Sequence, residues 1–281
     1  MTWYHELGIK YPLFQGGMAW ASNAELVAAV SNNGALGIIG SGGRTANELR
    51  RMIRKTKTLT SQPFGVNLML LDKNIKQLLE VICEEKISVV TTGAGSPKEI
   101  IDTIIANNIK LFPVVPNKEI ALKMLNLPIS GIIVEGNEAG GHVGIQNLAS
   151  LLKEIAPICP LPLIAAGGIY DHHTASLANI LGANGVQVGT AFLLAKECQI
   201  SPIYQELICK SEENGTSLIS DKNGHLTRLL NISSECSSNK SLKAAVETGD
   251  LINGAFMAGS ASAYLEKIEP VETIIQRIMK K

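Results

Sequence analysis

The sequence of 281 residues predicts an α/β fold in which eight parallel strands close into a (β/α)8, or TIM, barrel. Eight short apolar segments each precede a segment with helical spacing, at intervals of roughly 25 residues. The apolar segments are nearly continuous rather than alternating, which is typical of strands buried on both faces. Hydrophobic residues make up 46% of the chain and aromatic residues only 4%, a balance that suits such a sheet. A doubly wound open sheet is the alternative, but nothing in the sequence indicates the second domain that would accompany it.

Each unit consists of a strand, a loop and a helix, and glycine, asparagine, serine, threonine or aspartate punctuates the boundaries. The predicted strands are residues 12–14, 35–40, 64–70, 88–92, 110–115, 131–135, 161–166 and 185–194. The helices that follow them are residues 23–33, 45–58, 74–86, 97–108, 117–125, 147–156, 171–181 and 202–210.

The chain is predicted to form a single domain over residues 1–281. Residues 211–240 are rich in Ser, Asn and Glu and break the repeating pattern, so they are interpreted as a lid or mobile excursion within the barrel. Helical spacing returns at residues 241–247, and a last amphipathic helix at residues 271–279 completes the barrel.

Charge and cysteine content exclude several classes of protein. Lys and Arg total 25, as do Asp and Glu, so no global field attracts nucleic acid or a membrane. The five cysteines include no CxxC pair, which argues against a disulfide or metal framework. The first residues lack the features of a signal peptide, and no apolar run approaches the ~18 residues of a membrane span. These features favour a reduced, cytoplasmic protein.

The stretch most suited to chemistry follows the sixth predicted strand. It combines four glycines, two acids and one histidine, and it is expected to be a loop: Val134-Glu135-Gly136-Asn137-Glu138-Ala139-Gly140-Gly141-His142-Val143-Gly144. Glycines let the backbone adopt positive φ and approach a bound group closely, while imidazole has the unperturbed pKa nearest neutrality. A glycine-rich turn with a surface histidine is the alternative.

Two further glycine segments follow the seventh and eighth predicted strands, at Gly167-Gly168 and Gly189-Thr190. In a barrel these loops are neighbours, and bare backbone N–H groups there favour a phosphate. A phosphate-bearing cofactor is therefore predicted, with ordinary tight turns as the alternative. Asn67, at a strand end, could pair with the edge of a heterocycle. The basic run between Arg50 and Lys57 is interpreted as a solvated helix face.

Six ordered motifs closely resemble the flavin-dependent (type II) enoyl-[acyl-carrier-protein] reductases of the nitronate monooxygenase (2-nitropropane dioxygenase-like) superfamily. The similarity runs from about residue 11 to residue 210 and resumes at residues 241–260. The motifs are Phe14-Gln15-Gly16-Gly17-Met18-Ala19-Trp20, Phe64-Gly65-Val66-Asn67, Val89-Val90-Thr91-Thr92-Gly93-Ala94-Gly95, Glu135 to His142, Ile164 to Ile169 and Val186 to Thr190.

The resemblance implies an FMN-bound barrel that uses NADH or NADPH to reduce the trans-2 double bond of a thioester on acyl carrier protein. It also allows a monovalent cation and a homodimer. It places Gly167, Gly168, Gly189 and Thr190 at the FMN phosphate, with Gln187 nearby. It places Gln15, Gly17, Met18, Asn67, Gly140, Gly141, Met257 and Gly259 around the ribityl chain and ring, with Glu135 near the flavin.

His142 is the expected proton donor or orienting group, because an imidazole can give a proton and regain it from solvent. The other branch of the superfamily would use a similarly placed histidine as a base on an alkyl nitronate, with O₂ as oxidant. A flavin-binding protein without turnover is a third hypothesis. The region between His225 and Ser241 is shorter than in typical reductases of this group, so the acyl-chain length and the carrier contact are open.

Overall fold

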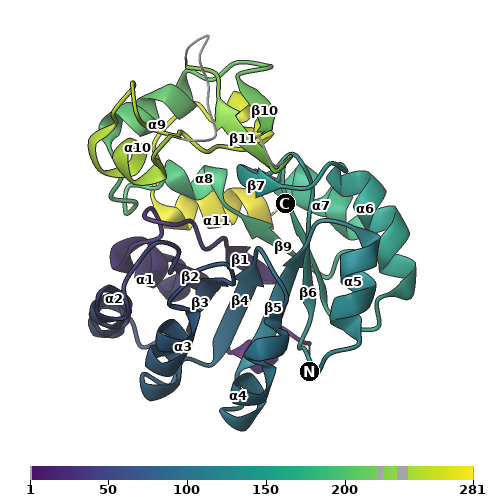
Figure 1. Cartoon of the computed structure of the whole chain (residues 1–281). Helices are drawn as coiled ribbons and strands as arrows, with labels where there is room; N and C mark the ends of the chain where they lie inside the picture. The colour runs from purple at the N-terminus through teal and green to yellow at the C-terminus, as the bar shows by residue number, and fades with distance from the viewer. Residues whose placement is uncertain (1, 221–223, 233–239, 281) are drawn as a thin grey trace.

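The computed structural model describes residues 2–220, 224–232 and 240–280 and confirms the predicted barrel (Figure 1). Within this part of the chain, eight parallel strands form one sheet in the order β1-β9-β8-β6-β5-β4-β3-β2. Phe14 of β1 and Leu36, next to β2, form a parallel bridge that joins the two ends of the sheet. Leu36 N donates to Leu13 O at 2.9 Å, and Gln15 N donates to Leu36 O at 2.9 Å. The sheet therefore closes into a ring.

The barrel strands are β1 (Leu13–Gln15), β2 (Gly37–Gly40), β3 (Phe64–Met69), β4 (Val89–Gly93), β5 (Lys110–Val115), β6 (Ile132–Glu135), β8 (Leu163–Ala166) and β9 (Gly185–Val188). The helices are α1 (Ala24–Asn32), α2 (Ala46–Leu59), α3 (Ile75–Glu84), α4 (Ile101–Ala106), α5 (Lys118–Leu125), α6 (Leu148–Ile155), α7 (His172–Ile180), α8 (Thr190–Leu193), α9 (Pro202–Cys209), α10 (Leu242–Thr248) and α11 (Val271–Met279). Short 3-10 turns lie at His5–Leu7, Pro97–Glu99, Ala156–Ile158 and Ser260–Tyr264.

Most helix starts lie where the sequence predicts them, because a capping side chain accepts a backbone N–H of the first turn. Thr45 and Glu48 form a capping box at α2, and Asp171 and Thr174 form another at α7. The remaining side-chain caps are Asn23, Asn117, Asn147 and Ser241.

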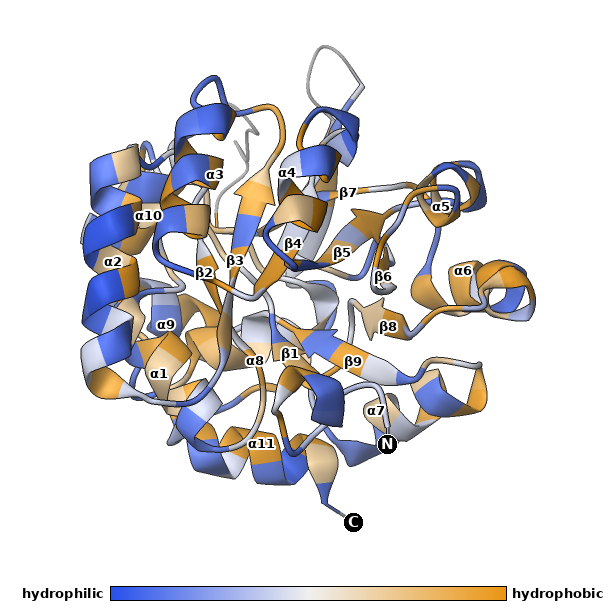
Figure 2. Ribbon diagram, turned by 90° about the horizontal axis from the view of Figure 1, so that it is seen from below, coloured by the Kyte–Doolittle hydropathy of each residue, from blue (hydrophilic) through white to orange (hydrophobic). Residues whose placement is uncertain are grey.

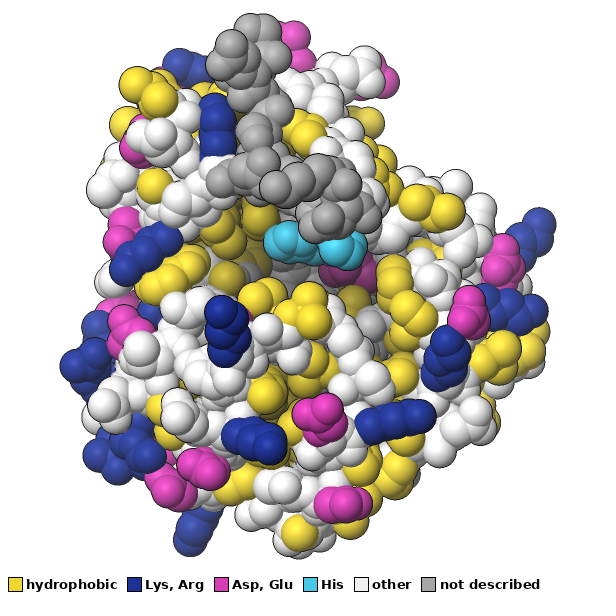
Figure 3. Space-filling view, in the orientation of Figure 1, with side chains coloured by type: hydrophobic (Ala, Val, Ile, Leu, Met, Phe, Trp, Pro, Cys, Tyr) yellow, Lys and Arg dark blue, Asp and Glu magenta, His cyan; other side chains and the backbone are white. Residues whose placement is uncertain are grey.

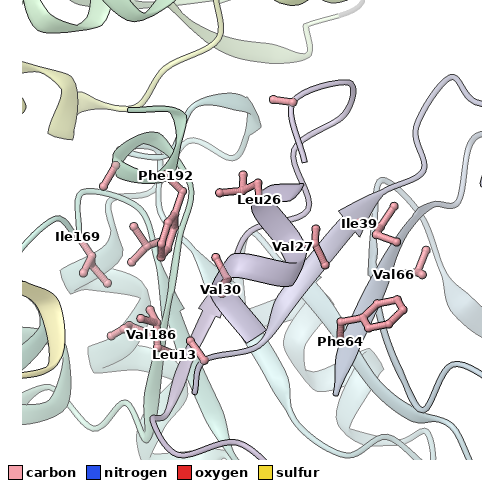
Figure 4. Packing of buried hydrophobic residues seen from close by; sticks show 14 of the residues in the cluster. Leu13, Leu26, Val27, Val30, Ile39, Phe64, Val66, Ile169, Val186 and Phe192 are labelled. Carbon is pink, nitrogen blue, oxygen red and sulfur yellow. The ribbon is translucent and has the colours of Figure 1, made fainter. Parts of the chain in front are cut away.

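Two apolar layers hold the barrel together. The larger layer lies between strands and helices, where Val27 and Val30 of α1 lie beside Leu13 and Ile39 of neighbouring strands (Figure 4). The second layer fills the barrel interior with residues of alternate strand positions: Phe14, Leu36, Ile38, Val89, Phe112, Ile133, Ile164 and Ala166. Figure 2, which looks up the barrel from below, shows the strands as a ring with the helices outside it.

A cap, which we define as α9, β10 (Thr216–Ser220), β11 (Leu226–Leu230) and α10, lies on one end of the barrel (Figure 1). β11 pairs antiparallel with both β10 and the short strand β7 (Gly141–Val143). The prediction of a loop throughout residues 136–144 is therefore wrong at Gly141–Val143, because a distant segment supplies the strand partner. The predicted excursion at 211–240 contains β10 and β11; its residues 221–223 and 233–239 lie outside the described part.

The predicted eighth strand is also too long. β9 ends at Val188, and Thr190–Leu193 forms the short helix α8. Apolar residues continue through both elements and are buried in both, so hydrophobicity alone does not mark the boundary.

The basic face of α2 is more engaged than the sequence indicates. Arg54 Nε donates to Glu85 Oε1 at 2.7 Å, and Lys57 Nζ lies 3.2 Å from Glu85 Oε2. Arg50 Nη1 lies 3.7 Å from Glu85 Oε1. Glu85 is 8% exposed. Burial raises the pKa of the Glu85 carboxyl, but the hydrogen bonds from Arg54 and Lys57 outweigh it and leave that pKa below its ordinary value.

The described helices include none that is long and apolar enough to cross a membrane. Four of the cysteines are free thiols, Cys83, Cys159, Cys198 and Cys209, and Cys236 lies outside the described residues.

Candidate functional site

The predicted site residues gather at one end of the barrel, where the carboxyl ends of the parallel strands meet. Glu135 ends β6, Gly167 follows β8, and Gly189 follows β9. Asn67 lies near the end of β3. Figure 3 shows a hollow between the cap and the barrel, walled largely by hydrophobic side chains, with histidine side chains at its edge. An apolar hollow with a few convergent polar groups is the usual form of a cofactor site.

The loop after β8 has a backbone that strongly favours glycine. Gly167 has φ +106° and Gly168 has φ +71°, conformations that other residues rarely adopt. A Cβ atom on Gly167 would lie 3.0 Å from Ala139 N and 3.2 Å from Gly136 O. The loop after β8 therefore packs directly against the backbone after β6. This packing leaves no room for a side chain at Gly167, where the sequence predicts that backbone N–H groups bind a phosphate.

The loops after β6 and β9 also meet the C-terminal segment 257–260. Gly259 N donates to Thr190 Oγ1 at 2.9 Å, and Ser260 N donates to Glu138 O at 2.9 Å. A Cβ on Gly259 would lie 2.6 Å from Glu138 O, and one on Gly140 would lie 2.7 Å from the Ala258 carbonyl carbon. The Thr190 hydroxyl accepts from Gly259 and keeps its own proton for another acceptor, as phosphate binding would require.

The loop after β1 completes the ring of contacts. A Cβ on Gly17 would lie only 2.3 Å from Asn67 Cβ, which explains why glycine occupies this position. Met18 Sδ lies 3.6 Å from where a Cβ on Gly189 would stand, an ordinary contact distance. Met257 Sδ lies 3.5 Å from the corresponding position on Gly141. The structure thus brings together the predicted residues of β1, β3, β6, β9 and the C-terminal segment.

Gln15 lies at the same end of the barrel, but its side chain is fully buried and serves the protein itself. Its Oε1 accepts from Ile38 N at 3.1 Å, and its Nε2 donates to Ser22 Oγ at 2.7 Å and to the Gly16 carbonyl. Ser22 Oγ also accepts from Met18 N at 2.8 Å. Gln15 therefore fixes the loop that carries Gly17 and Met18, and a direct contact with the flavin ring remains a prediction.

Three partly exposed side chains face the barrel interior at its upper end: Asn67, Glu135 and Gln187. Strand register places them there, since Glu135 lies two residues after the interior residue Ile133 and Gln187 pairs with interior Phe14. Within the described residues, none of the three side chains makes a hydrogen bond. Burial raises the pKa of Glu135 to about 8. Its carboxyl is therefore mostly neutral at pH 7.

These observations fit FMN. Unpaired polar groups at the floor suit a heterocycle that both donates and accepts hydrogen bonds, because a bound ring would bury them and buried polar groups are normally satisfied. Gly167, Gly168 and Gly189 carry no side chain, so these loops offer backbone where the sequence predicts the phosphate. His142 lies on β7 with an exposed side chain, opposite Thr227 of β11.

Two residues near the site were not among the predicted site residues. Tyr204 of α9 donates its buried hydroxyl to Met257 O at 2.7 Å, and burial raises the pKa of that hydroxyl. Arg228 of β11 donates to Asn137 O. The segment from Gly224 to Arg228 resembles the start of the family's lid region, but each residue reaches its partner across the fold, so the sequence did not indicate the contact.

Comparison with known proteins agrees with this geometry. The family model described as nitronate monooxygenase matches residues 3–78 and 73–239. The solved structure of FabK from Thermotoga maritima is 38% identical with a TM-score of 0.92, covering 97% of this chain and 92% of that chain. A probable nitronate monooxygenase from Staphylococcus haemolyticus is 30% identical over 281 aligned positions, which cover 82% of this chain and 79% of the relative.

A third relative, from Rhodococcus jostii, is (3aS,4S,5R,7aS)-5-hydroxy-7a-methyl-1-oxo-octahydro-1H-indene-4-carboxyl-CoA dehydrogenase. It is 34% identical over 194 residues, which cover 69% of this chain and 55% of that protein. The match thus spans little more than half of that relative. The family match covers most of the chain and is consistent with the barrel and its glycine-lined loops. The chain therefore belongs to the nitronate monooxygenase family of flavin-dependent oxidoreductases.

Proposed function

We propose that the protein reduces the trans-2 double bond of enoyl thioesters carried on acyl carrier protein, with NADH or NADPH as the electron source. The observation that carries this proposal is the match to FabK, at 38% identity and a TM-score of 0.92 over 97% of the chain. The ordered motifs that resemble the reductases support it. The Rhodococcus relative supports a thioester substrate, because its name specifies a carboxyl-CoA compound.

When bound, FMN would accept a hydride from the nicotinamide and supply one to the β-carbon of the thioester. Gly167, Gly168, Gly189 and Thr190 would hold its phosphate. Asn67, Glu135 and Gln187 would satisfy the polar edge of its ring. A neutral Glu135 carboxyl would act there as a hydrogen-bond donor, which a carboxylate cannot do.

His142 would hold a proton on a ring nitrogen and transfer it to the α-carbon of the thioester. Its exposed position lets solvent return that proton. Gly140 and Gly141 place no side chain between His142 and the loops beneath it. The apolar hollow in Figure 3 would exclude water from the thioester and receive its acyl chain.

Nitronate monooxygenase activity is the second candidate, because the Staphylococcus relative bears that name at 30% identity. Monooxygenases of bacteria that we would compare carry a lysine near the end of the fifth strand. In this chain β5 ends at Val115, Pro116 follows, and Lys118 is the first residue of α5. Lys118 thus lies on the helix as the sequence predicts, and this arrangement favours the reductase.

The test is anaerobic reduction of the purified holoenzyme by NADH or NADPH, followed by crotonyl thioester on acyl carrier protein or by propyl nitronate with O₂. Rapid reoxidation by the thioester is the expected result. Rapid turnover of nitronate with no response to the thioester would reject the proposal in favour of the monooxygenase. His142→Ala should lower kcat by about 100-fold with FMN still bound, in the range for a general acid. An unchanged kcat would remove His142 from the reaction.

A further inference from the structure

We propose that Arg228 is a positioning residue for His142: its guanidinium anchors the glycine-rich segment so that β7 presents the imidazole to the site. This inference rests on the proposed proton transfer by His142. It concerns a residue of the cap whose backbone pairs with Gly141 and whose side chain bonds to Asn137 and Thr216, neither of which is a proposed cofactor contact.

The backbone around His142 needs an external restraint. Gly140 precedes Gly141, which has φ +85°, and Gly144 follows Val143. Glycines have more backbone freedom than other residues, so this segment by itself would populate many conformations. A proton donor loses most of its advantage when its position varies by about 1 Å, a displacement that can cost about 100-fold in rate. Some contact outside the segment must therefore define where His142 lies.

β11 provides that contact through strand pairing. Leu226, Thr227 and Arg228 pair antiparallel with Val143, His142 and Gly141. β11 is itself held by β10 on its other edge. A pairing of only a few residues is weak on its own, because short two-stranded sheets are marginally stable in water. The restraint on His142 thus depends on what else ties β11 to the segment before β7.

The Arg228 side chain makes that connection. Its Nε donates to Asn137 O at 2.7 Å, and its Nη1 donates to Thr216 Oγ1 at 3.0 Å. A single planar guanidinium therefore links β10, β11 and the start of the glycine-rich segment. Because the guanidinium fork is rigid, two bonds from it fix orientation as well as distance.

The charge of Arg228 is used locally. The side chain is partly buried, and burial lowers the pKa of its guanidinium, while the nearby Glu138 carboxylate opposes that change. Glu138 in turn accepts from Leu148 N at 2.9 Å. The segment is thus held by α6 through Glu138 and by the cap through Arg228. Of these two contacts, the bond from Arg228 to Asn137 O comes from β11, the strand that pairs with β7 and His142.

A double-mutant cycle with His142 tests the inference in the holoenzyme. The variants are Arg228→Met, His142→Ala and their combination, assayed with crotonyl thioester on acyl carrier protein. R228M should lower kcat by about 10- to 100-fold, with bound flavin unchanged and KM altered by less than about threefold. In the H142A background R228M should lower kcat by less than about twofold, because that variant has no imidazole left for Arg228 to position.

Two further variants complete the design. R228K should show an intermediate loss, since an ammonium group lacks the fork that reaches both acceptors. Arg51→Met, on the exposed face of α2, is the matched control and should leave kcat unchanged. If R228M fails to fold or loses its flavin, the same cycle with R228K decides the question.

The outcomes separate this inference from the proposed function. An equal loss of kcat on R228M in both backgrounds would overturn the positioning role while leaving His142 as the proton donor. A rise in KM with kcat unchanged would also overturn it, since it would indicate that Arg228 binds the substrate. If H142A alone leaves thioester reduction unchanged, the proposed role of His142 fails. The comparison of H142A with the parent decides this point independently of the R228M variants.

Discussion

Glu135 should make the flavin-free protein less stable at high pH, because ionisation places a charge in the barrel interior. Burial raises its pKa from 4.5 to about 8. The folded state thus binds this proton more tightly than the unfolded state. The free energy of unfolding should therefore fall as pH rises from about 4.5 to about 8 and change little from this group outside that window.

The magnitude follows from the size of that difference. A pKa change from 4.5 to about 8 corresponds to at most about 5 kcal/mol, at 1.36 kcal/mol for each pH unit. Glu135 is only partly removed from solvent, so water reduces the penalty. We expect about 2–3 kcal/mol of destabilisation from ionised Glu135 near pH 9.

The variant Glu135→Gln keeps the shape of the neutral acid but cannot ionise. Urea unfolding of the flavin-free protein should show equal stability for E135Q and the parent at about pH 5. Near pH 9 E135Q should be more stable by the amount given above. Glu119→Gln is the control, because the exposed Glu119 has its pKa lowered by Lys123 and should gain nothing at high pH. Parallel pH profiles for E135Q and the parent would refute the reasoning.

Two other predictions concern glycine packing and the ion pairs of α2. Gly17→Ala should lower Tm by several degrees, because the new Cβ would lie 2.3 Å from Asn67 Cβ. Gly189→Ala should keep the Tm of the parent, because its Cβ would meet nothing closer than Met18 Sδ at 3.6 Å, but it should lose affinity for FMN in a fluorescence titration. Glu85→Gln should lower the free energy of unfolding at pH 7 by about 2–3 kcal/mol, measured with urea. The difference from the parent should vanish as pH falls through the lowered pKa of Glu85. The control Glu84→Gln, at an exposed carboxylate, should change the free energy of unfolding little. Equal Tm values for the two alanine variants, or equal costs for the two glutamine variants, would contradict these explanations.

The barrel could be predicted because its determinants are local and repeat. Each unit carries its own apolar strand and helix cap, and Thr45 or Asp171 marks a helix start without reference to any distant residue. Barrel closure then places the loops after β8 and β9 side by side, so Gly167 and Gly189 could be associated from their positions alone. Predicting the barrel was therefore enough to predict that these two loops of the candidate site are neighbours.

The rest of the site depends on contacts between distant segments. His142 lies on a strand only because Thr227 pairs with it, and no residue near His142 in the sequence indicates that partner. The Gln15 amide is occupied by Ile38 and Ser22, which the motif around Gln15 could not show. Pairings of this kind are decided by tertiary structure, which overrides local preference.

In the proposed function, cofactor binding and proton transfer depend mainly on different parts of the fold. The loops that would hold FMN are fixed by backbone contacts so close that a Cβ on Gly259 would lie 2.6 Å from Glu138 O, and they belong mainly to the barrel. His142 is fixed instead by β11 of the cap, through strand pairing and the Arg228 side chain. A change that loosens the cap should therefore leave a yellow protein that retains its flavin but protonates substrate slowly. A change that enlarges Gly259 should remove the flavin, and with it every later step.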